Sequence, residues 1–273
     1  MKSRRYGKKL SIFVAIVLMF GLLSGCNSNE QQGKSESEQA QKTEDVTIYL
    51  TRHGETMFNI MNKVQGWSDT PLTEEGEKVA ADLGKGLAQE KITFSAAYSS
   101  DLKRAFDTAT IVLANTDQKK LEIQQNKQLR EPNYGGYEGE FIDKITPELA
   151  AHNGFETGKE FQASAGKMYW NKLADTYQAM DTYKLAENAE SVEKRMEAEL
   201  LAIAKEQSQK GGGNVLVVSH GMAINIMLSK LSSEYEGKPL KNASVTKIVY
   251  KDGQLNVLSI GDVSYFEKGQ KKE

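Results

Sequence analysis

Short runs of apolar and β-branched residues recur along the chain from Val46 onward, and they predict the strands of a sheet. The first run covers residues 46–50. The run at 214–219 is continuously apolar in its middle, which is typical of a strand buried on both faces. Further strands are expected at 94–98, 121–123, 245–250 and 255–260. The last two flank Asp252-Gly253, a turn signal that predicts a β-hairpin.

Between these runs, apolar residues recur three or four positions apart, which predicts helices. One helix is expected over about 73–89, where Thr73 suits the N-cap and two glutamates follow at the positive end of the helix dipole. Others are expected at 100–114 and 222–231. Strands that alternate with helices imply an α/β fold with a mostly parallel sheet.

One region, at about 141–187, breaks this alternation. It is polar, helical in tendency and rich in aromatic residues, and it is predicted to be an inserted helical cap. A return helix is expected from Ser191. The aromatic residues of the cap are Tyr169, Trp170, Tyr177 and Tyr183. They could stack on a ring of a ligand or form a small core of their own, and the sequence leaves both open.

The first 25 residues are predicted to be a targeting segment. A basic stretch precedes an apolar run at 10–23, which is short for a membrane span of about 20 residues. The ending Leu23-Ser24-Gly25-Cys26 completes the pattern of a secretory signal peptide and resembles the bacterial lipobox. This resemblance implies a lipid on Cys26 and an anchor on the extracytoplasmic face of the cell membrane. The alternative is a buried core helix that contains an ordinary apolar cysteine.

Residues 26–45 contain almost nothing apolar, so they are predicted to be a disordered tether that leads into a folded domain at 46–273. The whole chain carries 35 basic and 37 acidic side chains. A group of the basic ones lies in the targeting segment, so the folded domain is the more acidic part. An acidic domain is a poor partner for nucleic acid, which excludes that class of function.

Two of the three histidines follow predicted strands, and a glycine follows each of them. His53 comes after the strand at 46–50, and His220 comes after the strand at 214–219. Ligands of open α/β sheets bind at these carboxyl ends, and the following helix N-terminus favours an anion. Arg52 is adjacent, and Arg104 begins the helix after the second strand, from where it could clamp a phosphate bidentately. A phosphate site is therefore expected.

Four sequence blocks, in this order, carry a resemblance to a known family. They are Arg52-His53-Gly54-Glu55-Thr56 with Asn59 and Gln65-Gly66, then 99–105, then Leu129-Arg130-Glu131 with 134–139, and finally 218–221. Together they resemble the histidine phosphatase superfamily, whose members have a phosphoglycerate-mutase-like fold, over roughly residues 46–260. The resemblance implies a three-layer α/β domain with helices on both faces of the sheet.

The resemblance also implies a role for each residue of the site. His53 would be the nucleophile that forms a phosphohistidine, and Glu131 would be the general acid and base. The phosphoryl oxygens would be bound by Arg52, Asn59, Gln65, Arg104 and a cationic His220. To attack, His53 must be neutral at one nitrogen, so the other is expected to donate to a fixed acceptor. Local capping is the alternative for Asn59 and Gln65, and no metal or cofactor is expected.

These features favour a metal-independent hydrolase that acts on a small phosphomonoester outside the cytoplasm. The block at 134–139 is similar to that of the phosphatase branch of the family. Two alternatives stay open at this point. One is a phosphoryl transferase of the phosphoglycerate mutase type, and the other is a non-catalytic lipoprotein that binds a phosphorylated ligand.

Overall fold

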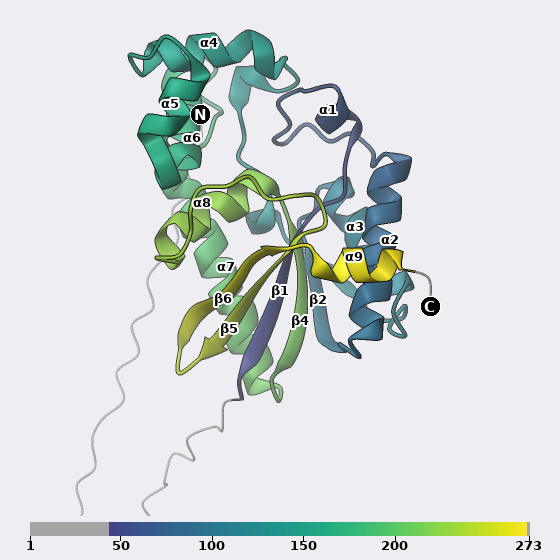
Figure 1. Ribbon diagram of the computed structural model, residues 1–273. Helices are drawn as coiled ribbons and strands as arrows, with labels where there is room; N and C mark the ends of the chain where they lie inside the picture. The colour runs from purple at the N-terminus through teal and green to yellow at the C-terminus, as the bar shows by residue number, and fades with distance from the viewer. Residues whose placement is uncertain (1–43, 272–273) are drawn as a thin grey trace, which may run out of the picture. The chain divides into compact units, whose positions relative to one another are not determined.

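The computed structural model describes residues 44–271, and a six-stranded sheet lies at the centre of this part of the chain (Figure 1). The strand order is β3-β2-β4-β1-β5-β6. The strands are β1 (Val46–Arg52), β2 (Phe94–Ser99), β3 (Ile123–Gln125), β4 (Gly213–Ser219), β5 (Val245–Lys251) and β6 (Gln254–Asp262). The first four pair in parallel, and the β5–β6 hairpin runs antiparallel at one edge. The third strand was expected at 121–123, which is wrong by two residues.

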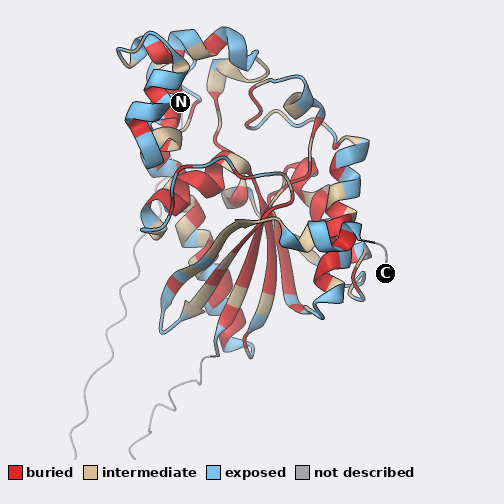
Figure 2. Ribbon diagram, viewed as in Figure 1, coloured by how far each residue is buried: buried red, intermediate tan, exposed pale blue. Residues whose placement is uncertain are grey.

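Helices cover both faces of this sheet, and the predicted three-layer α/β fold is confirmed. One face packs against α2 (Glu74–Gln89), α3 (Lys103–Ala114) and α9 (Ser264–Gln270), and the other against α7 (Ala189–Gln209) and α8 (Gly221–Leu231). Successive residues of β1 alternate between the layers, since Leu50 belongs to one buried cluster and Tyr49 to the other. Figure 2 shows the central strands as buried, whereas the β5–β6 edge is largely intermediate or exposed.

Local signals explain α2 but not the two short helices. Thr73 is the N-cap of α2 and accepts a hydrogen bond from the backbone N–H of Gly76, as the sequence predicts. Neither α1 (Met57–Ile60) nor α9 was expected. A Cβ added to Gly86 of α2 would lie 1.7 Å from the carbonyl oxygen of Tyr265 in α9. The contact joins helices that are far apart in the sequence, and the seven residues of α9 are too few to show an apolar periodicity. The sequence therefore carries no signal for this helix.

The segment predicted as a cap is helical. It consists of α4 (Ile142–His152), α5 (Gly158–Ala165) and α6 (Tyr169–Met180), which lie together above the carboxyl end of the sheet (Figure 1). Several of its aromatic rings pack on one another, among them Phe161 with Tyr169 at 5.5 Å between centroids. Tyr177 is buried, whereas Tyr183 is 72% exposed. Tyr169, Trp170 and Tyr177 thus form part of a small core, and whether any cap aromatic stacks on a ligand stays open.

The predicted signal peptide at 1–25 and Cys26 lie outside the described residues, as does most of the tether predicted at 26–45. Within residues 44–271, no helix is both long enough and apolar enough to span a bilayer.

Candidate active site

The two histidines singled out by the sequence meet at the carboxyl end of the sheet. β1 and β4 are parallel neighbours, and their register places Arg52 beside Ser219. The residues that follow, His53 and His220, are 2% and 0% exposed, and their ring centroids are 5.1 Å apart. Two segments far apart in the sequence thus form one site because their strands pair.

The position of one proton on His53 follows from its hydrogen bond. Nδ1 lies 2.7 Å from the carbonyl oxygen of Gly54, and since a carbonyl can only accept, Nδ1 carries the hydrogen. This confirms the predicted fixed acceptor and leaves a lone pair on Nε2. Burial holds the pKa of His53 well below 6.5, and the positive charges of Arg104 and Arg52 add to the effect. His53 is therefore neutral and keeps a lone pair on Nε2, toward which the Nε–H of Arg104 is directed.

Arg104 lies directly behind this nitrogen and is completely buried. Its Nε is 3.4 Å from Nε2 of His53, and its Nη atoms donate to the carbonyl oxygens of Gly66 (2.7 Å) and Ser68 (3.0 Å) and to the Asp69 carboxylate (3.0 Å). These partners occupy three of the four Nη hydrogens. Since the Nε–H donates to Nε2 of His53, one Nη2 hydrogen of Arg104 is left for a phosphoryl oxygen, and the predicted bidentate clamp requires Nε to leave His53.

The loop that holds Arg104 depends in turn on Glu138. Its carboxylate accepts hydrogen bonds from the backbone N–H groups of Gly66, Trp67 and Ser68, and from that of Tyr134. Glu138 lies in the family-like block at 134–139, but the sequence assigned no role to it or to Asp69. Their partners became visible only once the fold brought 66–69 beside 134–138.

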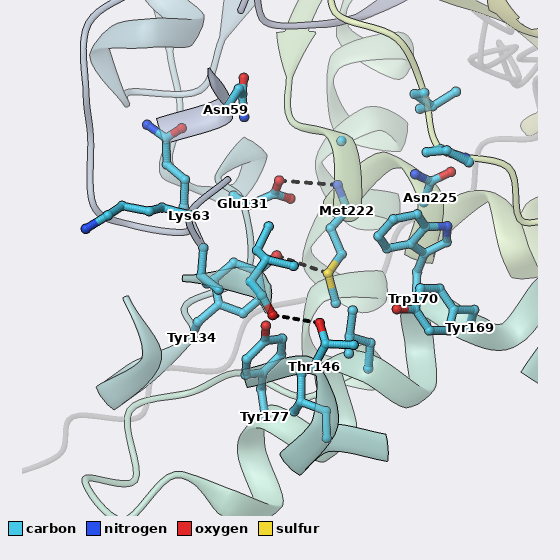
Figure 3. Close-up of a pocket in the computed structure, with 18 of the residues that line it drawn as sticks. Asn59, Lys63, Glu131, Tyr134, Thr146, Tyr169, Trp170, Tyr177, Met222 and Asn225 are labelled. Atoms are coloured by element: carbon cyan, nitrogen blue, oxygen red, sulfur yellow. Dashed lines mark hydrogen bonds between the residues drawn. The ribbon is translucent and has the colours of Figure 1, made fainter. Parts of the chain in front are cut away.

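Glu131 lies across the pocket and is 7% exposed. Its carboxylate accepts hydrogen bonds from the backbone N–H groups of Met222 (3.2 Å) and Ala223 (2.7 Å) in the first turn of α8. Figure 3 shows the bond from Met222. Burial raises the pKa of Glu131, although these two bonds and the charge of Arg104 act in the opposite direction. A carboxyl group whose pKa is raised is suited to donate a proton.

A residue outside every sequence block fixes the backbone of Glu131. Arg195 of α7 donates to the carbonyl oxygens of Gln128, Arg130 and Glu131, and it forms an ion pair with Glu187 at 2.9 Å. Sequence reasoning missed it, because an arginine inside an amphipathic helix is normally a surface residue.

Polar atoms without partners surround His53. Among the described residues, Nε of Arg52 and both ring nitrogens of His220 are buried without a hydrogen bond. Native proteins rarely leave buried donors unsatisfied, so these atoms indicate an anionic ligand. Burial holds the pKa of His220 well below 6.5, helped by the charge of Arg104. The cationic form predicted for His220 in the phosphoryl-bound site stays a prediction, and in the protein alone burial and the nearby positive charges favour the neutral ring.

Asn59 and Gln65 also reach the pocket, and both are partly engaged by the protein. Asn59 forms a capping box with Thr56 at the start of α1, which uses its amide oxygen and leaves its amide nitrogen for a ligand. Gln65 accepts from the Thr56 hydroxyl at 2.6 Å and donates to the Thr70 hydroxyl at 2.9 Å. Both residues therefore combine the local role that the sequence left open with a place in the site.

These residues open into a cavity of about 280 Å³ between the sheet and the cap. Arg52, His53, Asn59, Gln65 and Glu131 line it, whereas Arg104 and His220 lie behind this lining. Across residues 44–271, no cluster of histidine, cysteine or carboxylate side chains could hold a metal ion. The site can therefore bind an anion next to an uncharged imidazole nitrogen, with a carboxyl group nearby to move a proton.

Comparison with known proteins places this geometry in context. A family model described as "Histidine phosphatase superfamily (branch 1)" matches residues 48–263. A 2,3-bisphosphoglycerate-dependent phosphoglycerate mutase from Streptococcus pneumoniae (strain Hungary19A-6) is 30% identical over 229 residues, which cover 78% of this chain and 97% of the relative.

Two solved structures are similar as well. Phosphoglycerate mutase from Bacillus anthracis str. Sterne is 42% identical, with a TM-score of 0.79 over 85% of this chain and 99% of that chain. Phosphoserine phosphatase from Entamoeba histolytica, in complex with 3-phosphoglyceric acid, is 25% identical, with a TM-score of 0.59 over 81% of this chain and 99% of that chain. Proteins similar to this chain are thus named both as mutases and as phosphatases.

Inorganic phosphate is expected to raise the pKa of His220, because a dianion beside a buried imidazole favours its charged form. In an NMR titration, the ring resonances of His220 should move at higher pH in phosphate than in chloride of equal ionic strength. His152, an exposed residue at the end of α4, serves as the internal control. A His220 titration that phosphate leaves unchanged would argue against an anion site here.

Proposed function

This chain belongs to the histidine phosphatase superfamily, and we propose that within it the protein is a hydrolase of small phosphomonoesters. The observation that carries the proposal is the neutral Nε2 of His53, flanked by the buried, unpartnered Nε of Arg52 and ring of His220. A nucleophile needs the lone pair, and the phosphoryl oxygens need the surrounding donors.

The geometry supports a reaction in two steps. Nε2 of His53 attacks phosphorus, the P–O bond to the alcohol breaks, and Glu131 gives its proton to the departing oxygen. Glu131 then takes a proton from water, whose oxygen attacks the phosphohistidine and breaks the P–N bond. Inorganic phosphate leaves, and both residues return to their starting forms. Arg52, Arg104 and His220 would stabilise the negative charge on the phosphoryl oxygens, His220 becoming cationic once the dianion is bound.

A mutase is the second candidate, because similar proteins carry that name. Such an enzyme must hold a second anionic group of its substrate while the phosphoryl group stays on the histidine. In the part of the chain that the structure describes, the lysines and arginines that line the cavity are Arg52 and Lys63. The Lys63 ammonium lies over the ring of Phe141, 4.4 Å from its centroid. This sparse positive charge favours a substrate with one phosphate and no further anion.

His53→Ala is expected to reduce the release of phosphate from aryl and alkyl phosphates to background, since it removes the nucleophile. The wild-type activity should persist in a chelator. The same samples should be given 3-phosphoglycerate with 2,3-bisphosphoglycerate and followed for isomerisation. Isomerisation without phosphate release would establish the mutase instead, and the absence of both reactions, together with no phosphate trapped on His53, would leave a binding protein.

Glu131→Gln is expected to lower kcat for alkyl phosphates by about 10²–10⁴-fold, the usual contribution of a general acid. For nitrophenyl phosphate the first step should be much less affected, because that leaving group needs no proton, and phosphohistidine should accumulate. The pH profile supplies a second readout. Since the pKa of Glu131 is raised above 4.5 and that of His53 lies well below 6.5, wild-type activity should fall as the pH rises through the Glu131 pKa.

In the Glu131→Gln variant this alkaline decline should disappear. Glu148→Gln, which changes an exposed carboxylate on the cap, serves as the matched control and should keep the wild-type profile. An alkaline decline that survives in Glu131→Gln would assign the general acid to another group.

We further propose that the domain is tethered outside the cytoplasm by a lipid on Cys26, which the lipobox-like ending of the targeting segment supports. Cys26→Ser should abolish the incorporation of labelled fatty acid into the protein without changing its kcat. Incorporation that is equal in Cys26→Ser and the wild type would contradict a lipid on Cys26.

A further inference from the structure

The cavity continues past the phosphate end into a chamber lined by the cap. Its walls come from Leu149 of α4, Phe161 of α5, and Tyr169, Trp170, Leu173 and Tyr177 of α6, and we call it the cap chamber. Figure 3 shows Tyr169, Trp170 and Tyr177 on this side of the pocket, away from Glu131. The side chains that would surround the alcohol part of a substrate are therefore mostly apolar.

Three of the polar atoms among these walls are occupied by the protein, whereas the hydroxyls of Tyr169 and Tyr177 and the amide nitrogen of Asn225 have no hydrogen bond among the described residues. The indole N–H of Trp170 donates to the carbonyl oxygen of Gly237 at 2.9 Å, and the Tyr134 hydroxyl donates to the sulfur of Met222 at 3.0 Å. The Thr146 hydroxyl donates within its own helix to the carbonyl oxygen of Ile142 at 2.7 Å. The three groups without a hydrogen bond are few for the several hydroxyl or charged groups of a sugar, a glycerol or an amino acid, which would lose its water against mostly apolar walls, and this disfavours such polar leaving groups.

The chamber has room for a substituent of moderate size. An engineered apolar cavity of about 150 Å³ is enough to hold benzene. The present cavity of about 280 Å³ can therefore contain a phosphate together with one ring or a short alkyl chain.

The entrance of the pocket is apolar too. Phe141 and Ile142 are 48% and 38% exposed, and Ile142 is itself part of the pocket lining. Phe141 is joined by an isolated β-bridge to Lys63, which also lines the pocket. Exposed apolar side chains that gather at a pocket mouth indicate a surface used for binding. A chain too long for the chamber would meet this rim.

We propose that the natural substrates are amphiphilic phosphomonoesters, in which the phosphate is esterified to an apolar alkyl or aryl alcohol. The inference rests on the proposed hydrolase function and adds the chemical class of the leaving group. His53 and the buried donors recognise the phosphate, and the cap chamber recognises the hydrocarbon.

The test is a series of n-alkyl phosphates, from ethyl to hexyl, with glycerol 3-phosphate and phosphoserine as polar counterparts, all given to the full-length protein. The value of kcat/KM should rise about fourfold per methylene until the chamber is full, since burying one CH₂ is worth about 0.8 kcal/mol. Both polar esters should fall below butyl phosphate. A flat series, or a preference for the polar esters, would overturn the inference while leaving the hydrolase intact.

A matched pair of variants locates the effect. Ile142→Gln should lower the ratio of kcat/KM for hexyl over ethyl phosphate by about fivefold, because it places an amide in the apolar entrance of the pocket, which the longer chain reaches. Leu258→Gln makes the same change at a 60% exposed leucine of β6 that does not line the pocket, and should leave the ratio unchanged. Equal ratios in Ile142→Gln and the wild type would show that the hydrocarbon is recognised elsewhere, contrary to the proposal.

A binding series separates the inference from the hydrolase function. Calorimetry with n-alkylphosphonates, which cannot be hydrolysed at a P–C bond, should show the Kd falling with chain length. If no ester is hydrolysed but the phosphonates bind more tightly as they lengthen, the hydrolase fails and the ligand class stands. If binding does not depend on chain length, the ligand class fails, whatever the catalytic result.

Discussion

A fully buried positive charge, the guanidinium of Arg104, determines how the rest of the site is built. A charge in a protein interior is costly unless it is paired and hydrogen-bonded. Here Asp69 supplies the countercharge, and the carbonyl oxygens of Gly66 and Ser68 take further hydrogens. The Glu138 carboxylate then holds that loop by accepting hydrogen bonds from the backbone N–H groups of Gly66 and Ser68. Several residues of the family-like blocks therefore keep one cation next to His53, where burial and then this charge lower the pKa of the imidazole.

On the opposite side of the pocket, the buried group is a carboxyl group, that of Glu131, which in the proposed reaction must both hold and release a proton. Desolvation alone would keep Glu131 protonated, and the N-terminus of α8 with the nearby arginines alone would keep it ionised. Burial thus raises the pKa of Glu131, while the hydrogen bonds and the arginine charges lower it. Arg195 fixes the backbone of this residue from behind, so that the balance does not shift with movement of the loop.

The sequence was sufficient to predict those features that depend on residues next to one another in the chain. β-branched runs located β1 and β4, Thr73 marked the start of α2, and a histidine at the end of each of two strands marked the site. It was insufficient where a partner comes from elsewhere in the fold. The short α9 forms because Gly86 lets its backbone approach α2. The roles of Asp69, Glu138 and Arg195, and the neutral state of His220, likewise depend on neighbours that only the folded chain supplies.

The pairing of β1 with β4 has a consequence for how the protein folds during its synthesis. Arg52 and Ser219 are adjacent in the sheet although most of the domain lies between them in the chain. Closing so long a loop is entropically costly, and contacts of this kind make folding slow. A nascent chain that has left the ribosome as far as α6 already contains His53, Arg104 and Glu131, but not the strand and helix that complete their site. The protein should thus remain catalytically silent until its synthesis is almost finished.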